Sequence, residues 1–213
     1  MDNPEWLKRF FAWLESPYPY AEDTRRALED RGIRVDGEMF ADILTNVCRE
    51  RISYFGEIKA MIDNGELDYY FFAPLDNPRS TNEAADEERA FKQLIICPEK
   101  MRKNGAGEKT EVDAASTASI LNQVGEILEK HTLGESADDT EARDAASGGW
   151  TKEGLKEALW PLAEHEGRGV VLWPLRVALS GAERSPDPFV LASILGKKET
   201  LDRVRAAILT LEK

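Results

Sequence analysis

The sequence has few of the features of a membrane, secreted or metal-binding chain. It contains two cysteines, Cys48 and Cys97, and two histidines in 213 residues. Each cysteine lies in an apolar setting without a Cys or His nearby at the spacing of metal ligands, so we expect reduced core thiols and no metal site. No apolar run approaches the ~20 residues that span a bilayer, and the N-terminal stretch "MDNPEWLKRF" contains no signal core. We therefore expect a cytoplasmic protein that does not bind a membrane.

Positive charge is also scarce. The net charge of −12 argues against a general nucleic-acid binder, because such proteins carry a basic surface. The deficit is uneven along the chain: residues 165–213 hold 8 basic and 6 acidic side chains, whereas acidic residues predominate in 1–75 and in 76–148. Any contact with a polyanion should therefore lie in the C-terminal segment, and should be selective.

Apolar residues recur at helical spacing through most of the chain, and no alternating pair of strands occurs. We predict an all-α fold with two helical subdomains joined by a polar, partly flexible hinge. The N-terminal subdomain is predicted at residues 1–75 and the C-terminal subdomain at 149–213. The acidic, Gly/Ser/Asp-rich stretch 76–148 is predicted to be the hinge, with one or two helices.

Several residue types mark where the helices begin and end. The glycines predicted to close helices are Gly32, Gly181 and Gly196. Thr151 and Asp187 are predicted to cap helix starts, because their side-chain oxygens can accept from the first free N–H groups. Pro174 is predicted to be the first residue of a short helix, since proline lacks an N–H and its φ is already helical. A long helical pattern runs from residue 36 to 62, with Ser53 as a candidate N-cap of a second helix within it.

Two arginines fall among apolar residues. Arg176 interrupts the apolar run "LWPLRVALSG", and Arg51 falls on the centre of the apolar face if the predicted helix runs unbroken. A helix break near Ser53 would make Arg51 a terminal residue instead. Burying an arginine head is costly unless something accepts its hydrogen bonds, so an acidic neighbour, water or a ligand must do so.

No catalytic group can be identified in the sequence. "GAGEKT" at residues 105–110 is not a phosphate-binding loop, because Glu108 separates the glycine from the lysine and no apolar helix follows at once. His131 and His165 stand apart in polar surroundings without a cysteine or serine partner. We therefore predict no catalytic residue in this chain.

Three motifs near the C-terminus form an ordered set: "PLRVALSG", the following Ser-Pro loop, and "ILGKKETLDRVRAAI". This set resembles the C-terminal anticodon-binding region of bacterial-type glutamyl-tRNA synthetases, without gaps from about residue 170 to 210. The N-terminal third is similar to the preceding helical subdomain of that family, through "CRERISYFGEI" and "YYFF". The resemblance implies an α-helical cage around the anticodon loop of a tRNA.

The resemblance also implies a role for each arginine. The residue matching Arg176, together with those matching Ser185 and Pro186, reads the first two anticodon bases. The residue matching Arg51 reads the third base and helps to exclude the glutamine tRNA. Supporting RNA contacts are expected from Arg168, Trp173 and Arg184. A further arginine of some family members is Ala158 here, which implies looser recognition of the second base.

The same resemblance implies the partner and the wider reaction. We expect binding of tRNA(Glu), as the C-terminal part of a glutamate-tRNA ligase that uses ATP, and we expect a monomer. The chain has no HIGH-type motif, Rossmann fingerprint or KMSKS loop, so glutamate, ATP and Mg²⁺ would act in a separate class I catalytic half and this chain would be inactive alone. A free-standing tRNA-binding paralogue and a helical protein-interaction module without RNA binding remain as alternatives.

Overall fold

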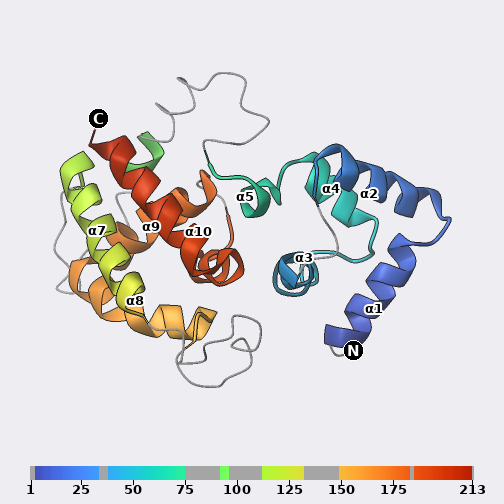
Figure 1. Cartoon of the computed structure of the whole chain (residues 1–213), viewed down its shortest axis with the longest axis horizontal. Helices are drawn as coiled ribbons and strands as arrows, with labels where there is room; N and C mark the ends of the chain where they lie inside the picture. Colours follow the sequence, from blue (N-terminus) through green and yellow to red (C-terminus); the bar gives the residue numbers. More distant parts are fainter. Residues whose placement is uncertain are drawn as a thin grey trace. The chain divides into compact units, whose positions relative to one another are not determined.

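A computed structural model describes residues 3–33, 38–74, 92–95, 112–131, 149–182 and 185–212. Throughout these ranges the regular structure is helical and contains no strand, which confirms the predicted all-α class (Figure 1). The chain divides into two compact units, Met1–Phe71 (unit 1) and Phe72–Lys213 (unit 2). Of the helices in the described ranges, none is long and apolar enough to cross a membrane.

Unit 1 is a set of short helices. In chain order they are α1 (Asn3–Leu14), α2 (Pro19–Asp30), α3 (Glu38–Ile43), the π-helix η1 (Leu44–Cys48), α4 (Glu57–Asp63) and α5 (Asp68–Phe71). The end of α2 is as predicted: Gly32 has a φ of 65°, and the Ile33 N–H donates to the Leu28 carbonyl at 2.9 Å. This left-handed glycine satisfies the last carbonyls of the helix at no steric cost.

An aromatic cluster forms the core of unit 1. The ring of Phe55 lies 5.4 Å from that of Trp6, 5.5 Å from Phe10 and 5.6 Å from Trp13, measured between centroids. Phe10 is fully buried and also packs against Phe40 of α3. Phe55 therefore fixes the turn that precedes α4 against helix α1.

The helical pattern over residues 36–62 is interrupted, and of the two alternatives for Arg51 the structure shows the one with a break near Ser53. The Arg49 N–H donates to the Leu44 carbonyl, which widens the helix into η1, and the chain then leaves the helix in a turn. The Glu57 carboxylate accepts from the Ser53 N–H at 2.5 Å and so begins a new helix, α4. Arg51 therefore lies in a turn, and not on the centre of an apolar helical face.

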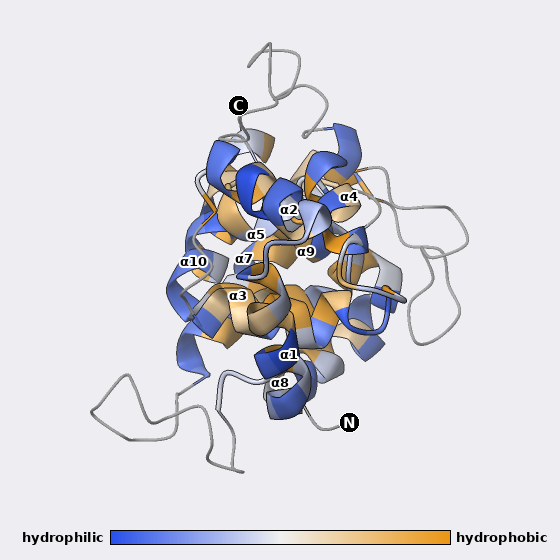
Figure 2. Cartoon of the chain, turned by 90° about the vertical axis from the view of Figure 1, so that its right-hand side faces the viewer, coloured by the Kyte–Doolittle hydropathy of each residue, from blue (hydrophilic) through white to orange (hydrophobic). Residues whose placement is uncertain are grey.

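Unit 2 is built on four longer helices. They are α7 (Ala114–Lys130), α8 (Lys152–Glu166), α9 (Arg168–Ser180) and α10 (Pro188–Leu211), and α10 packs against the other three (Figure 1). The helices carry hydrophobic residues on one side and hydrophilic residues on the other (Figure 2). Thr151 and Asp187 cap α8 and α10 as predicted, and Gly196, with a φ of 78°, kinks α10 at the predicted stop.

Helix α7 lies within unit 2, although the sequence placed it in the predicted hinge, 76–148. Its apolar face, with Leu121, Val124 and Leu128 fully buried, packs against α9 and α10. Because an amphipathic helix this long must bury its apolar face, it joins the nearest core. Most of the remaining predicted hinge lies outside the described residues.

The prediction that Pro174 begins a helix was wrong. Helix α9 begins at Arg168, and Pro174 is a buried interior residue. Proline is unfavourable inside a helix because it has no N–H to donate to the carbonyl one turn before it. Here the burial of the apolar helix outweighs that cost. Arg176 therefore lies in the second half of α9, not in a first turn.

A buried arginine joins α9 to α10. Arg203 is 4% exposed; its Nε donates to Glu199 at 2.7 Å, and its Nη1 donates to the Leu179 carbonyl at 2.5 Å, in the last turn of α9. We expect Arg203→Met to lower the free energy of unfolding by about 2–3 kcal/mol, because hydrogen bonds to charged groups contribute that much and the Leu179 carbonyl would stay buried without this donor.

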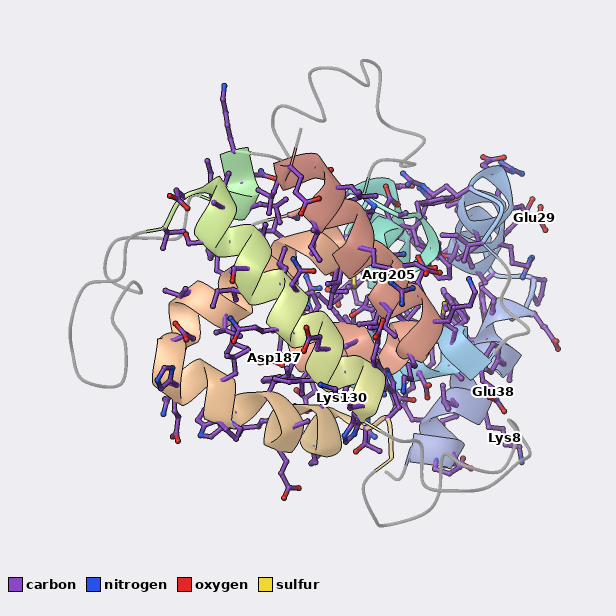
Figure 3. All side chains as sticks on the ribbon, turned by 60° about the vertical axis from the view of Figure 1, so that its left-hand side comes forward. Lys8, Glu29, Glu38, Lys130, Asp187 and Arg205 are labelled. Carbon is purple, nitrogen blue, oxygen red and sulfur yellow. The ribbon has the colours of Figure 1, made fainter. Side chains whose placement is uncertain are left out.

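Urea unfolding followed by circular dichroism measures this effect. Arg205→Met is the matched control: Arg205 is an exposed arginine on the same helix (Figure 3), paired with Glu129 at 2.6 Å. Exposed pairs contribute about 0–1 kcal/mol, so the control should change little. Equal losses in the two variants would show that Arg203 does not hold α9 to α10.

Candidate nucleic-acid interface

Arg176 lies on α9 with part of its charge sheltered from water. Its neighbours Leu175 and Val177 are buried, and its own side-chain Nε is buried without a hydrogen-bond partner. Within the part of the chain that the structure describes, no carboxylate pairs with this guanidinium and no group accepts a hydrogen bond from it. The residue as a whole is half-buried, so the guanidinium lies at the surface with one donor already desolvated.

Such a donor is unfavourable in the protein by itself. A buried polar group without a partner costs about 1–3 kcal/mol, and native structures satisfy nearly all such groups. A ligand that accepts from Nε would recover this cost on binding. The arrangement is therefore that of a binding group held by its packed stem, not of a charge that stabilises the fold.

The Ser-Pro loop follows α9 after a sharp stop. Gly181, with a φ of 65°, closes the helix through its N–H to the Val177 carbonyl at 2.7 Å. Ser185 and Pro186 are half-buried, and Asp187 then caps α10 by accepting from the Phe189 N–H at 2.9 Å. The loop is thus fixed at both ends, and it starts about 6 Å along the helix axis from Arg176, since one turn of α-helix separates them.

The predicted supporting residues are distributed differently. Arg168 begins α9, about 12 Å along the axis from Arg176, and its guanidinium lies 4.5 Å from the centre of the half-buried Trp160 ring. Trp173 is half-buried and its indole N–H donates to the Gln93 carbonyl at 2.9 Å. Arg184 lies outside the described residues. Trp173, three residues before Arg176, shares its helix face, whereas Arg168 lies at the other end of the helix.

Arg51 has a different environment, in unit 1. Its guanidinium pairs with the Glu66 carboxylate, and about half of its side chain is exposed. An exposed ion pair contributes only about 0–1 kcal/mol, so a phosphate or a base can replace Glu66 at little cost. The structure thus makes Arg51 an accessible cation in a fixed turn.

The buried Cys48 thiol and Tyr69 hydroxyl near Arg51 are not ionised at neutral pH. Burial raises the pKa of the Cys48 thiol and of the Tyr69 hydroxyl to about 12 each, although the nearby Arg51 charge acts in the opposite direction. Both groups therefore stay protonated at neutral pH, and Cys48 is the buried free thiol that we predicted; Cys97 lies outside the described residues. Across the described ranges, no three His, Cys, Asp or Glu side chains gather as a metal site would require.

The helices that carry Arg176 and its loop match a known family. The sequence model of a family described as "Anticodon binding domain" covers residues 107–208, which include α7, α8, α9 and most of α10. Residues 107–208 are thus similar to anticodon-binding domains. The matched range starts before α7 and so includes part of the predicted hinge, 76–148; the predicted domain bounds stay a prediction.

Several glutamate-tRNA ligases are similar to this chain. That of Clostridium novyi is 48% identical over 62 residues, which are 28% of this chain and 13% of that protein. That of Christiangramia forsetii is 23% identical over 213 residues, 99% of this chain and 32% of that protein. These findings confirm the resemblance noted from the sequence. The chain spans a third or less of the length of these relatives.

A solved structure shows the same fold. The crystal structure of a glutamate tRNA ligase from Elizabethkingia meningosepticum, in complex with its amino acid, superposes with a TM-score of 0.53. The two chains are 23% identical, and the match covers 99% of this chain and 30% of the other. At this identity the likeness concerns the fold alone.

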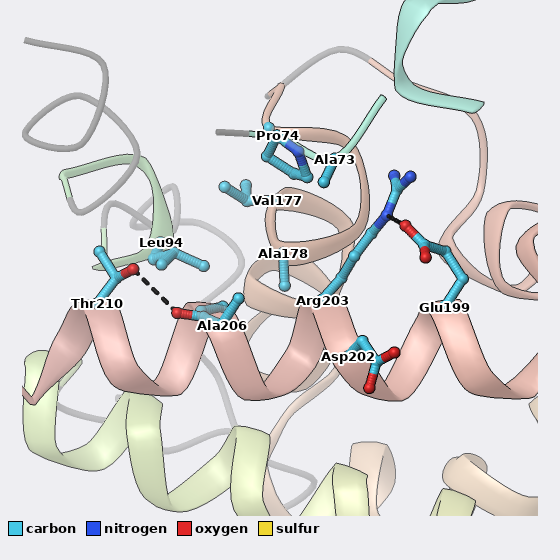
Figure 4. Close-up of a pocket in the computed structure, with 12 residues that line it drawn as sticks. Ala73, Pro74, Leu94, Val177, Ala178, Glu199, Asp202, Arg203, Ala206 and Thr210 are labelled. Carbon is cyan, nitrogen blue, oxygen red and sulfur yellow. Dashed lines mark hydrogen bonds and ion pairs between the residues drawn. The ribbon is translucent and has the colours of Figure 1, made fainter. Parts of the chain in front are cut away.

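Unit 2 also contains a cavity that the sequence did not predict. It has a volume of about 360 Å³ and lies beside α10, between Leu94, Pro74 and the C-terminal half of α9. Its walls are mostly apolar, with the Arg203–Glu199 ion pair at one end (Figure 4). Glu199 and Arg203 are four residues apart on one helix, and this spacing is the sequence signal that could have indicated the ion pair.

The unpartnered donor gives a prediction about stability. Arg176→Met should leave the free energy of unfolding within about 0.5 kcal/mol of the wild type or raise it, because the variant removes a buried polar group that nothing satisfies. The urea midpoint measures this, with Arg203→Met as the comparison. A loss for Arg176→Met as large as that for Arg203→Met would mean that Arg176 serves the fold and not a ligand.

Proposed function

We propose that this chain binds the anticodon loop of a tRNA, that the tRNA is the one for glutamate, and that Arg176 and Arg51 read its bases. The observation that supports this most is the buried Arg176 Nε without an acceptor, on a domain of the anticodon-binding family. Bases of a single-stranded loop are splayed out and present their pairing edges to protein donors. A planar guanidinium held by packing around its stem suits that task.

The charge of the chain supports a selective mode of binding. A chain with a net charge of −12 gains little from general attraction to RNA, so affinity has to come from a few placed contacts. Ser185 and Pro186 join Arg176 at the first two anticodon bases in this proposal, with Trp173 beside them. Arg168 and Arg184 add contacts to the RNA backbone.

The proposal leaves the ligation reaction to another part of a ligase. Attachment of glutamate, with the ATP and Mg²⁺ that it requires, belongs to the length of the relatives that this chain does not span. The chain itself contributes recognition, as a monomer in the cytoplasm. A gel-shift titration of the purified chain with glutamate and glutamine tRNA transcripts, at two salt concentrations, tests the proposal. It predicts tighter binding of the glutamate tRNA and affinity that falls as salt is added.

A protein-interaction module remains as the competing function. In that case both arginines would pair with carboxylates of the same chain. Arg51 does pair with Glu66, but Arg176 has no such partner in the described ranges. RNA binding that does not depend on salt, or no RNA binding, would favour the competing function.

Arg176→Ala should weaken binding of the glutamate tRNA by about 1–3 kcal/mol, the usual cost of a lost base contact, while the fold is retained. Arg205→Ala is the matched control, since it removes the same charge from an exposed position of the same domain. Fluorescence anisotropy with labelled tRNA measures both. Equal binding of glutamate and alanine tRNAs by the wild type and by Arg176→Ala would reject the assigned role.

Arg51→Gln should admit glutamine tRNA more readily, because the shorter neutral side chain loses the charged donor assigned to the third base. The measured quantity is the ratio of the two dissociation constants, for glutamine and for glutamate tRNA. Arg26→Gln, at an exposed arginine on α2 paired with Glu22, controls for the lost charge in unit 1. An unchanged ratio in Arg51→Gln would count against the third-base role.

A further inference from the structure

Unit 1 exposes tyrosine rings that its core does not use. Among the described residues, the large apolar side chains with high exposure are Tyr18 at 64%, Tyr20 at 69%, Tyr54 at 62% and Leu209 at 62%. Three of these four are tyrosines of unit 1. Two of them, Tyr20 and Tyr54, each have a side-chain atom close to one backbone position, Gly56.

Gly56 is small because the Tyr54 ring lies over it. A Cβ added at Gly56 would lie 2.9 Å from Cε2 of Tyr54, closer than real contacts allow, and 3.8 Å from Cβ of Tyr20. The φ of Gly56 is −62°, which any residue adopts, so a side chain at this position would be opposed by the Tyr54 ring, which would have to shift, and not by the backbone conformation. One face of the Tyr54 ring therefore rests against the backbone, while most of the side chain stays open to solvent.

The backbone beneath this ring is held firmly. The Glu57 carboxylate accepts from the N–H groups of Ser53 and Tyr54, at 2.5 and 3.4 Å. The next side chain, Phe55, is inserted in the aromatic cluster between Trp6 and Phe10. Tyr54 is thus an exposed aromatic ring on a turn fixed from both sides, which is the form of a stacking surface that loses little entropy on binding.

The same turn carries Arg51, three residues before Tyr54. Their Cα atoms lie at most about 11 Å apart, because three residues span no more. A guanidinium and an open aromatic ring at this spacing fit one partner chemistry well, that of a nucleotide with a negative phosphate and a flat base. Proteins that bind single-stranded RNA combine these two elements.

We infer that Tyr54, flanked by Tyr20, stacks on an unpaired anticodon-loop base next to the base read by Arg51. This inference rests on the proposed function and adds a positioning surface to it. The tyrosine ring stacks on the face of one base, whichever base it is. This stacking positions the loop so that the Arg51 donors reach the edge of the neighbouring base. Removal of the ring should weaken the binding of all tRNAs by the same factor. Removal of Arg51 should instead change the ratio of the affinities for different tRNAs.

The test uses the whole chain and tRNA transcripts carrying 2-aminopurine at single positions of the anticodon loop. Fluorescence of this base falls when it stacks on an aromatic ring. The wild type should quench one loop position, and Tyr54→Ala should restore its fluorescence and weaken binding about five- to hundredfold, in line with the stacking of one base. Tyr54→Phe should keep both properties.

Two further variants separate stacking from a structural effect. Gly56→Ala keeps the tyrosine but places a methyl group where its ring lies, so it should also reduce quenching and binding without unfolding the chain. Tyr18→Ala is the matched control, since Tyr18 is as exposed as Tyr54 but does not adjoin Gly56. It should leave quenching unchanged.

The outcomes distinguish the inference from the proposed function. Wild-type chain that binds no tRNA refutes the proposed function, and the inference with it. Wild-type chain that binds tRNA with the expected salt dependence, while Tyr54→Ala alters neither quenching nor affinity, refutes the inference alone. A loss of unfolding free energy in Tyr54→Ala that equals the loss in binding would also overturn it.

Discussion

Two arginines of the same domain show what its packing is arranged to do. Arg203 is buried and donates hydrogen bonds to Glu199 and to the Leu179 carbonyl, so it holds α9 to α10. Arg176, on the helix that Arg203 holds, has a buried Nε with no acceptor among the residues that the structure describes. Arg203 therefore fixes the packing of α9 against α10, and this packing positions Arg176 at the surface. The unsatisfied donor is tolerable because the rest of α9 is packed well enough to carry the cost.

The ends of the helices could be predicted from the sequence because they depend on local chemistry. Gly32, Gly181 and Gly196 all have positive φ, and Thr151 and Asp187 cap helices where expected. Features that depend on tertiary packing could not be predicted. Pro174 lies inside α9 against its own preference, and α7 joins the core of unit 2 although polar segments flank it in the sequence. Both the helical conformation at Pro174 and the packing of α7 depend on contacts with residues distant in sequence.

The candidate site shows the same division. The sequence singled out Arg51 and Arg176 as cations among apolar residues, but periodicity placed Arg51 on a helix that η1 in fact interrupts. Its partner Glu66 and the Tyr54 ring over Gly56 follow from the turn that replaces that helix. Ser53 marked a possible break in the sequence, but spacing could not predict η1, because a π-helix adds only one residue to the hydrogen-bonded turn of an α-helix. The roles assigned to Ser185, Pro186, Arg168, Trp173 and Arg184 stay predictions.

The most direct test of an arginine held ready for RNA is the side-chain Nε–Hε signal of Arg176 in nitrogen-15 NMR spectra, assigned with Arg176→Lys. Addition of the anticodon stem-loop of glutamate tRNA should shift this signal, because Nε–H gains an acceptor. The Nε–Hε signal of Arg203, which already has Glu199, should stay in place. A stem-loop that binds while the Arg176 signal does not move would contradict the central claim.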